Sequence, residues 1–275
     1  MNKILEKRKL AQDTTLMVID TQPISAKALP GQFIILRTHD NGERIPLTIV
    51  NSNPENKTIT IVFQEIGKTT KLLGRLNTGE YIHDLAGPLG HASELIKYPN
   101  KIVVIGGGVG IAELLPVTIG LKNAGNSVAG IIGARNKDLL IFEDELRKTV
   151  DELHVVTDDG SKGQKGFVTD ALNNIINNGG TPENISLVYA VGPVPMMRAV
   201  SVLTLNFKIK TIVSLNPIMI DGTGMCGSCR CTINGKTKFG CVDGPEFDGH
   251  SVDWNELQTR LGQFKPFEKQ SLGTI

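Results

Sequence analysis

Short apolar runs rich in β-branched residues recur through the first third of the chain, separated by turns containing Gly, Pro and Asn. Leu29-Pro30-Gly31 and Asn51-Ser52-Asn53-Pro54 are two such turns, because Pro presets φ and Gly accepts positive φ. Runs at this spacing are typical of a small antiparallel barrel, here interrupted by one helix expected over residues 68–76. The expected strands are Leu16–Ile19, Gln32–Arg37, Leu47–Val50, Thr58–Phe63 and Tyr81–Leu85.

The pattern changes at Pro99, where apolar strands begin to alternate with helical segments. Strand and helix in strict succession predict a doubly wound parallel sheet. The expected strands cover residues 102–105, 128–132, 153–156, 187–191 and 211–214, and the expected helices cover residues 111–123, 142–148, 168–177 and 195–205.

The alternation stops after Asn216, and Asn234-Gly235 there marks the turn of a hairpin. The sequence therefore predicts three parts. Residues 1–98 form an antiparallel Greek-key β-barrel, residues 99–215 a doubly wound parallel α/β nucleotide domain, and residues 216–275 a small C-terminal lobe.

Composition narrows the function classes. The chain is 40% hydrophobic and 21% charged, and 29 Lys+Arg against 28 Asp+Glu leave a net charge of only +1, which argues against nucleic acid as a partner. No apolar run follows the charged first ten residues, so no secretory signal is expected. No stretch approaches about 18 apolar residues, so no membrane partner is expected either, and we expect a cytoplasmic protein.

All four cysteines fall between positions 226 and 241, a clustering that favours a metal site over disulfides in a reducing compartment. Plant-type 2Fe-2S clusters use Cys-x4-Cys-x2-Cys followed at a distance by a fourth Cys. This chain has Asp221-x4-Cys226-x2-Cys229-x11-Cys241, so a carboxylate, itself an anionic ligand for iron, fills the first position. Two alternatives stay open: Cys231 as fourth ligand in place of Asp221, and zinc held by all four thiolates, although zinc ribbons usually present two Cys-x2-Cys pairs.

Residues 101–110 read as a strand, a glycine-rich turn and a helix start, an arrangement that binds pyrophosphate through backbone N–H groups. The dinucleotide fingerprint is imperfect, because Ile111 replaces its third Gly and no acidic residue ends the second strand. Two later loops, 157–161 with Asp158 and 191–195 with Gly192 and Pro193, either border the nucleotide or are plain connections. Arg135 is a candidate partner for a 2′-phosphate, which leaves NADH against NADPH open.

In the barrel, Arg44, Pro46 and Thr48 lie on one expected strand, where Arg suits a pyrophosphate and the strand backbone suits a flat ring. Gly67-Lys68-Thr69-Thr70 starts a helix and offers a second anion site. It is not a P-loop, because Val62 stands where that motif needs Gly. Taken singly, each of these segments is a structural feature; together they suggest a flavin site.

In this order, the parts resemble the ferredoxin-NADP reductase superfamily over residues 10–215. With its C-terminal lobe, the chain resembles two kinds of electron-transfer subunit: the small subunit of NADH-dependent reduced ferredoxin:NADP oxidoreductase, also known as the sulfide dehydrogenase small subunit, and the electron-transfer subunit of dihydroorotate dehydrogenase. The segments Asp221-Gly-Thr-Gly-Met-Cys-Gly-Ser-Cys and Cys241-Val-Asp-Gly-Pro are most similar to the first, whose cluster has one Asp and three Cys ligands. The second kind would place Cys at 221.

The resemblance implies an NAD(H)-linked oxidoreductase subunit with FAD, a 2Fe-2S cluster and NADH. It implies Arg44, Pro46, Leu47 and Thr48 at the flavin, Gly67, Thr69 and Thr70 at the FAD phosphates, and Gly107, Gly108 and Gly110 at the pyridine nucleotide. The implied partner is a larger FAD and iron-sulfur flavoprotein of the glutamate-synthase small-subunit type, through which ferredoxin is reached, with or without electron bifurcation.

Such a subunit needs no acid or base of its own, because the cofactors carry the chemistry. The five histidines are scattered along the chain and form no acid-base or nucleophile set with a neighbour. The sequence therefore predicts no catalytic side chain. Two competing hypotheses are a dihydroorotate dehydrogenase electron-transfer subunit and, from another class, a zinc-stabilised binding module.

Overall fold

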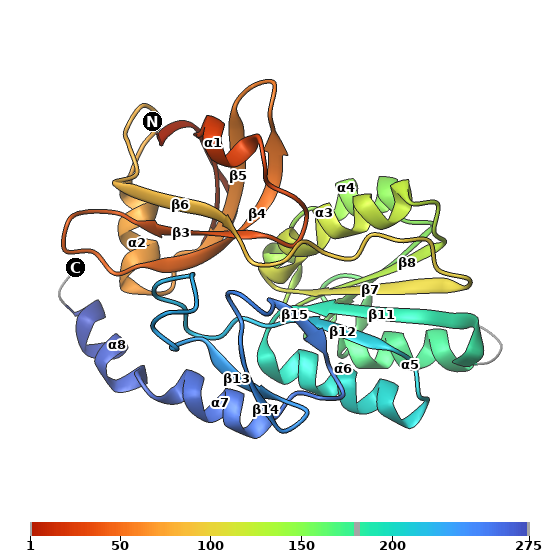
Figure 1. Ribbon diagram of the computed structural model, residues 1–275. Helices are drawn as coiled ribbons and strands as arrows, with labels where there is room; N and C mark the ends of the chain where they lie inside the picture. Colours follow the sequence, from red (N-terminus) through yellow and green to blue (C-terminus); the bar gives the residue numbers. More distant parts are fainter. Residues whose placement is uncertain (1, 179–181, 274–275) are drawn as a thin grey trace. The chain divides into compact units, whose positions relative to one another are not determined.

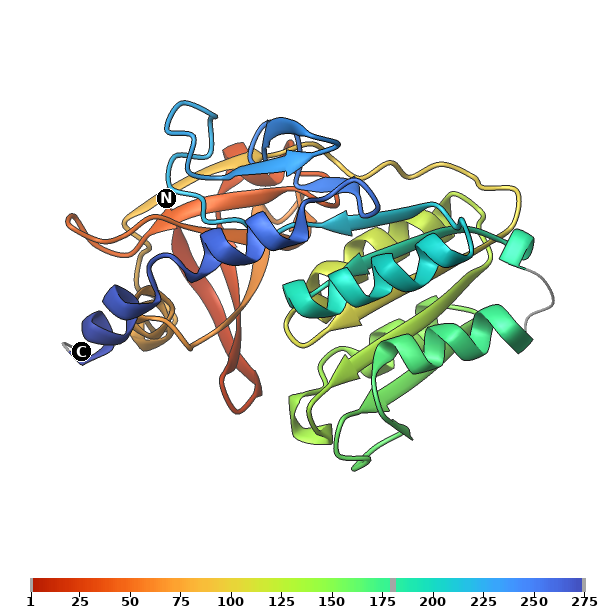
Figure 2. The same ribbon diagram turned by 90° about the horizontal axis from the view of Figure 1, so that it is seen from below.

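The computed structural model describes residues 2–178 and 182–273, which form two compact units (Figures 1 and 2). The barrel unit takes the chain up to Ala92, then Asn216–Pro245, then the chain from Asp253 onward. The sheet unit takes Ser93–Leu215 and Glu246–Val252. The C-terminal segment is thus shared between the two units, and the division into three domains at residues 98 and 215 stays a prediction.

A six-stranded antiparallel sheet builds the barrel unit, in the order β1-β2-β5-β4-β3-β6. A bridge between Lys3 and Tyr81 joins the first edge to the chain leading into the last strand, which closes the barrel. Inside it, Met17, Ile61 and Phe63 belong to one buried cluster. The strands are β1 Lys3–Ala11, β2 Thr14–Asp20, β3 Phe33–Arg37, β4 Ile45–Asn53, β5 Thr58–Gln64 and β6 Asp84–Leu89, with helices α1 Gln22–Ser25 and α2 Lys68–Arg75 between them.

The barrel agrees with the prediction for β2 to β5 and for α2, and differs at both ends. Strand β1 was not predicted, because most of its residues are charged and only Ile4 among them is buried. The last strand begins at Asp84 instead of Tyr81, since Tyr81 makes only the isolated bridge to Lys3.

The sheet unit is a doubly wound seven-stranded sheet in the order β10-β9-β8-β7-β11-β12-β15. Its strands run parallel except β15, which pairs antiparallel with β12. Helices α3 and α4 cover one face, and α5 and α6 cover the other (Figures 1 and 2). The strands are β7 Lys101–Gly107, β8 Val128–Ala134, β9 Glu152–Thr157, β10 Gln164–Lys165, β11 Ile185–Val191, β12 Thr211–Ser214 and β15 Glu246–Asp248. The helices are α3 Gly110–Asn123, α4 Glu143–Thr149, α5 Val168–Asn178 and α6 Val194–Asn206, with short 3-10 turns at Lys137–Leu139 and Pro182–Asn184.

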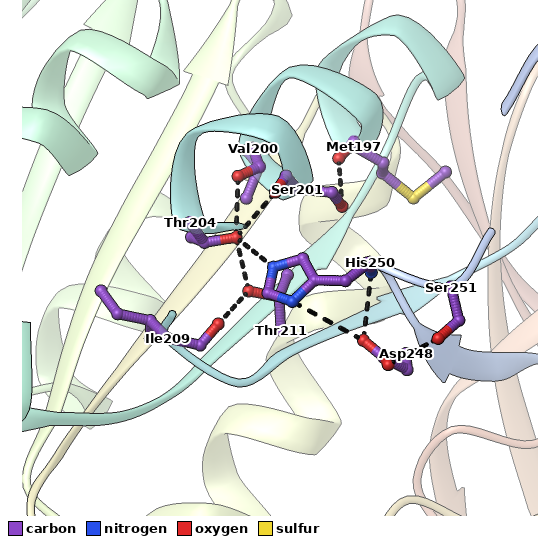
Figure 3. A network of polar contacts seen from close by, with 9 residues as sticks. All are labelled: Met197, Val200, Ser201, Thr204, Ile209, Thr211, Asp248, His250 and Ser251. Atoms are coloured by element: carbon purple, nitrogen blue, oxygen red, sulfur yellow. Dashed lines mark hydrogen bonds and ion pairs between the residues drawn. The ribbon is translucent and has the colours of Figure 1, made fainter. Parts of the chain in front are cut away.

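Strand β15 comes from the C-terminal segment, where no further sheet strand was expected, and a polar network anchors it (Figure 3). Nε2 of His250 lies 2.9 Å from Oγ1 of Thr204 on α6, which also accepts a hydrogen bond from the Thr211 hydroxyl at 2.6 Å. The His250 amide donates to the carboxylate of Asp248 at 3.0 Å. Thr204 is fully buried, so its hydroxyl serves to hold the structure together.

The rest of the C-terminal segment belongs to the barrel unit. The predicted hairpin is confirmed as β13 Arg230–Ile233 and β14 Lys236–Phe239, with φ of 49° at Asn234 and 70° at Gly235 at the turn. Helices α7 Trp254–Gly262 and α8 Lys265–Leu272 follow, and the carboxylate of Asp253 caps α7 by accepting from two backbone amides. Among the described residues, no helix is long and apolar enough to cross a membrane.

Candidate cluster and nucleotide sites

The carboxylate of Asp221 organises the loop predicted to bind the cluster. Its Oδ2 atom accepts hydrogen bonds from the amide and hydroxyl of Thr223, at 3.0 and 2.7 Å, and from the amide of Met225 at 3.2 Å. The bonds from Thr223, more than any other interaction, lower the pKa of Asp221. Asp221 is therefore anionic at neutral pH, which is the form in which a carboxylate binds a metal. Its hydrogen bonds also shape the turn.

Two glycines let this loop fold closely. Gly222 and Gly224 have φ of 82° and 88°, in the left-handed region. A Cβ atom on Gly222 would lie 2.7 Å from Cδ1 of Leu89 and 2.9 Å from Cγ1 of Ile35. A side chain at position 222 would thus push the loop away from strands β3 and β6.

The three cysteines predicted as ligands differ in their surroundings. Cys229 and Cys241 are buried with their Sγ atoms 3.2 Å apart, packed with Phe33 and Met219. Burial, together with Cys229, raises the pKa of Cys241 to about 12. Cys226 is exposed, and a hydrogen bond with the Ser228 hydroxyl, 3.1 Å away, lowers its pKa.

These donors fit a cluster of two irons, because each iron of such a cluster takes two protein ligands. Cys229 and Cys241 make one pair by direct contact. Asp221 and Cys226 lie close enough that each acts on the pKa of the other through a backbone hydrogen bond, and we expect them to form the other pair. Among the described residues, no group of three or more His, Cys, Asp or Glu side chains is arranged to hold a metal ion, so neither ligand set is preassembled.

Cys231 takes part in the hairpin. Its thiol donates to the carbonyl of Lys238 across β13 and β14, at 3.7 Å. Burial raises its pKa to about 12, as burial also does for Cys241, so the pKa does not distinguish the two thiols. The arrangement favours Asp221 over Cys231 as the fourth ligand, which stays a prediction.

The structure brings the predicted nucleotide glycines together with Gly192 and Pro193, where the strand order reverses between β7 and β11. A Cβ atom on Gly110 would lie 2.6 Å from the carbonyl oxygen of Val191, and one on Gly107 would lie 3.2 Å from Cδ of Pro193. Gly108, with φ of 57°, faces open space, as a phosphate-binding turn requires. This crevice at the carboxyl ends of parallel strands is the usual ligand site of such sheets.

Asp158 lies at the same edge of the sheet but apart from the glycine turn. It follows β9, two strands from β7, and its amide donates to the carbonyl of Ala134 at 3.1 Å. Its role at the nucleotide therefore stays a prediction, separate from that of the turn.

In the barrel unit, Arg44 directly precedes β4, and Pro46, Leu47 and Thr48 lie on that strand, paired with β3. Gly67 caps helix α2, and its amide donates to the Thr70 hydroxyl at 3.0 Å. Thr69 is buried, and its hydroxyl donates to Oε2 of Glu43 at 2.8 Å.

That contact places the start of α2 beside the chain that carries Arg44, so the two predicted flavin segments lie side by side. Glu43 was missed from the sequence, because a charged residue in an exposed turn gives no sign that it reaches a helix 26 positions away.

Two segments of the chain match known protein families. Residues 216–253 match the iron-sulfur cluster binding domain of dihydroorotate dehydrogenase B, and residues 104–202 match the oxidoreductase NAD-binding domain. The first match spans the Asp221 loop and all four cysteines. The second begins in β7 and ends in α6.

Relatives match over nearly the whole chain. A protein of Thermotoga maritima described as a homologue of the dihydroorotate dehydrogenase B (NAD(+)) electron transfer subunit is 46% identical over 98% of this chain and 94% of its own length. The electron transfer subunit of dihydroorotate dehydrogenase B of Fusobacterium nucleatum is 30% identical over 90% of this chain and 96% of its own.

Two solved structures are similar to this chain. A chain of the NADH-dependent reduced ferredoxin-NADP oxidoreductase, reported in a study of flavin-based electron bifurcation, superimposes with a TM-score of 0.93 at 44% identity, covering 100% of this chain and 97% of that one. The FAD/NAD binding domain of a nitric oxide dioxygenase from Vibrio cholerae superimposes with a TM-score of 0.61 at 18% identity, covering 77% of this chain and 97% of that one, and shares the fold alone.

Proposed function

Because this chain belongs to the family of electron-transfer subunits related to that of dihydroorotate dehydrogenase B, we propose that it relays electrons from NADH to a larger iron-sulfur flavoprotein. Membership confirms the predicted resemblance, the oxidoreductase function and the cofactors FAD, 2Fe-2S and NAD(H). The identity of the partner and the residue assignments are the proposed part.

The choice between the two candidate partners rests on Asp221. A carboxylate in the first ligand position is the feature that the resemblance assigns to the NADH-dependent ferredoxin:NADP oxidoreductase type. The chain is 44% identical to a chain of that enzyme, against 29 to 30% to curated dihydroorotate dehydrogenase B electron-transfer subunits. We therefore assign a larger FAD and iron-sulfur subunit as partner, through which electrons reach ferredoxin.

The chain's own residues would bind and orient the cofactors. The glycine turn after β7 leaves Gly108 facing open space, which suits a pyrophosphate, while Gly110 packs closely against β11. Arg44 and the start of α2 suit the phosphates of the flavin cofactor. Asp221, Cys226, Cys229 and Cys241 would hold the cluster in two pairs. When bound, the flavin accepts a two-electron hydride and releases electrons singly, which is the chemistry that the protein positions.

Paired cysteine variants test the site. Cys226→Ser should abolish or strongly reduce the iron content of anaerobically purified protein, whereas the matched Cys231→Ser should keep both iron and flavin absorption. Loss of iron in both variants would instead replace Asp221 by Cys231 in the ligand set, and iron kept in Cys226→Ser would remove Cys226 from it.

Co-purification tests the partner. Tagged protein isolated from cells that express it natively should bring down a large protein containing FAD and iron-sulfur clusters. Recovery of an FMN-containing barrel enzyme instead would establish the dihydroorotate dehydrogenase alternative. Zinc in a colourless preparation would support the binding-module hypothesis.

A further inference from the structure

A row of residues crosses the carboxyl edge of the sheet unit. The pairing register aligns Gly106 with Val191, Val191 with Ser214, and Ser214 with Glu246 on β15. Neighbours in register point their side chains to the same face of a sheet. Glu246 therefore stands on the row from which the glycine turn departs.

Two hydroxyl groups hold the Glu246 carboxylate in place. Its Oε1 atom accepts from Oγ of Ser93 at 2.5 Å and from the phenol of Tyr189 at 2.8 Å. Tyr189 is buried in β11, two residues before the end of the strand. Burial raises the pKa of Glu246, although both hydrogen bonds act in the opposite direction.

Negative charge gathers around this carboxylate. Glu113, in the first turn of α3, and Glu246 both raise the pKa of Tyr189, after the larger effect of burial. Glu94 also acts to raise the pKa of Glu246. Nζ of Lys210 lies 3.8 Å from Oε2 of Glu94, and both side chains are more than half exposed. This cation therefore offsets the charge of Glu94 rather than that of Glu246.

We propose that Glu246 determines the redox-state preference of the nucleotide site, favouring the cationic nicotinamide of NAD⁺ over the neutral dihydronicotinamide of NADH. This inference rests on the proposed binding of the nucleotide at the glycine turn. A fixed, partly desolvated carboxylate at that edge attracts a positive ring and leaves a neutral ring almost unaffected. Since only the oxidised form gains, the charge also makes hydride release from bound NADH more favourable.

Isothermal titration of the oxidised protein, with its cofactors bound, tests this with three probes. NAD⁺ carries the cationic ring, tetrahydro-NADH is a neutral analogue that donates no hydride, and ADP-ribose lacks the nicotinamide. In Glu246→Gln we expect NAD⁺ affinity to fall about fivefold, equivalent to about 1 kcal/mol, while the other two probes change less than about twofold. The control Glu145→Gln removes an equal but exposed charge on α4 and should leave all three unchanged.

Glu246→Asp keeps the charge and should keep the preference for NAD⁺ even if packing at β15 changes. Equal weakening of NAD⁺ and ADP-ribose in Glu246→Gln, or no change in NAD⁺ affinity, would overturn the inference and leave the nucleotide site intact. Failure of the unmodified protein to bind ADP-ribose would instead remove the proposed nucleotide site itself.

Discussion

Replacement of Gly110 by Ala tests the geometry of the nucleotide turn. The new Cβ would lie 2.6 Å from the carbonyl oxygen of Val191 and 2.8 Å from Cα of Gly192. Both neighbours are backbone atoms, so strand β11 or helix α3 must shift. Overpacking of this kind costs about 1–3 kcal/mol, which lowers the unfolding temperature of a chain of this size by roughly 2–10 °C.

The shift should also weaken nucleotide binding, because the turn presents its amides from the segment that moves. We expect ADP-ribose affinity, measured by titration calorimetry, to fall at least about tenfold. Gly120→Ala, in the same helix, is the matched control. Its Cβ would meet the tip of the Leu95 side chain, which can rotate away, and alanine favours a helix interior over glycine. Equal affinities and melting temperatures for Gly110→Ala and the unmodified protein would refute the close packing of turn and strand.

Three further predictions address the cluster, the anchor of β15 and the barrel. Asp221→Cys should keep a cluster but change its midpoint potential, because a thiolate donates more strongly than a carboxylate; an unchanged potential in a redox titration would count against Asp221 as a ligand. His250→Ala should cost about 1–3 kcal/mol and speed hydrogen exchange in β15 while sparing the barrel unit, and unaltered β15 exchange would contradict the anchor. Burial acts to raise the pKa of Glu65, but hydrogen bonds from Lys9 and Thr15 outweigh it and lower the pKa. A carboxyl whose pKa is lowered by folding stabilises the fold at neutral pH, and this stabilisation is lost as the pH falls through the lowered pKa. Glu65→Gln should therefore be about 1 kcal/mol less stable at neutral pH and equally stable in acid, where the carboxyl is protonated; a pH-independent difference in unfolding midpoints would disprove this.

The parts of the fold that follow local patterns were predictable. Strands β7, β8 and β11 are apolar along most of their length, because both faces of a parallel sheet are covered, and this composition and the flanking turn residues are visible in the sequence. Strand β1 escapes prediction since most of its residues are charged and only Ile4 among them is buried. Strand β15 escapes it because three residues between a proline and a short turn carry no period.

The candidate cluster site was predictable for the same local reason, since Asp221, Cys226 and Cys229 lie within nine residues and their spacing is itself the signal. Contacts between distant segments could not be foreseen. Glu246 meets Ser93 and Tyr189 only through the register of β12 with β15, and their separations of 153 and 57 positions are invisible in a single sequence.

The chain passes between the two units four times, and this has a consequence for synthesis on the ribosome. The seventh strand of the sheet unit emerges only with Glu246–Val252, long after the other six. The barrel unit waits in turn for Asp253 and the residues beyond it. Neither unit can reach its final form while the nascent chain lacks its last tenth. Early termination should therefore leave both units incomplete, whereas two domains in simple succession would leave the first one complete.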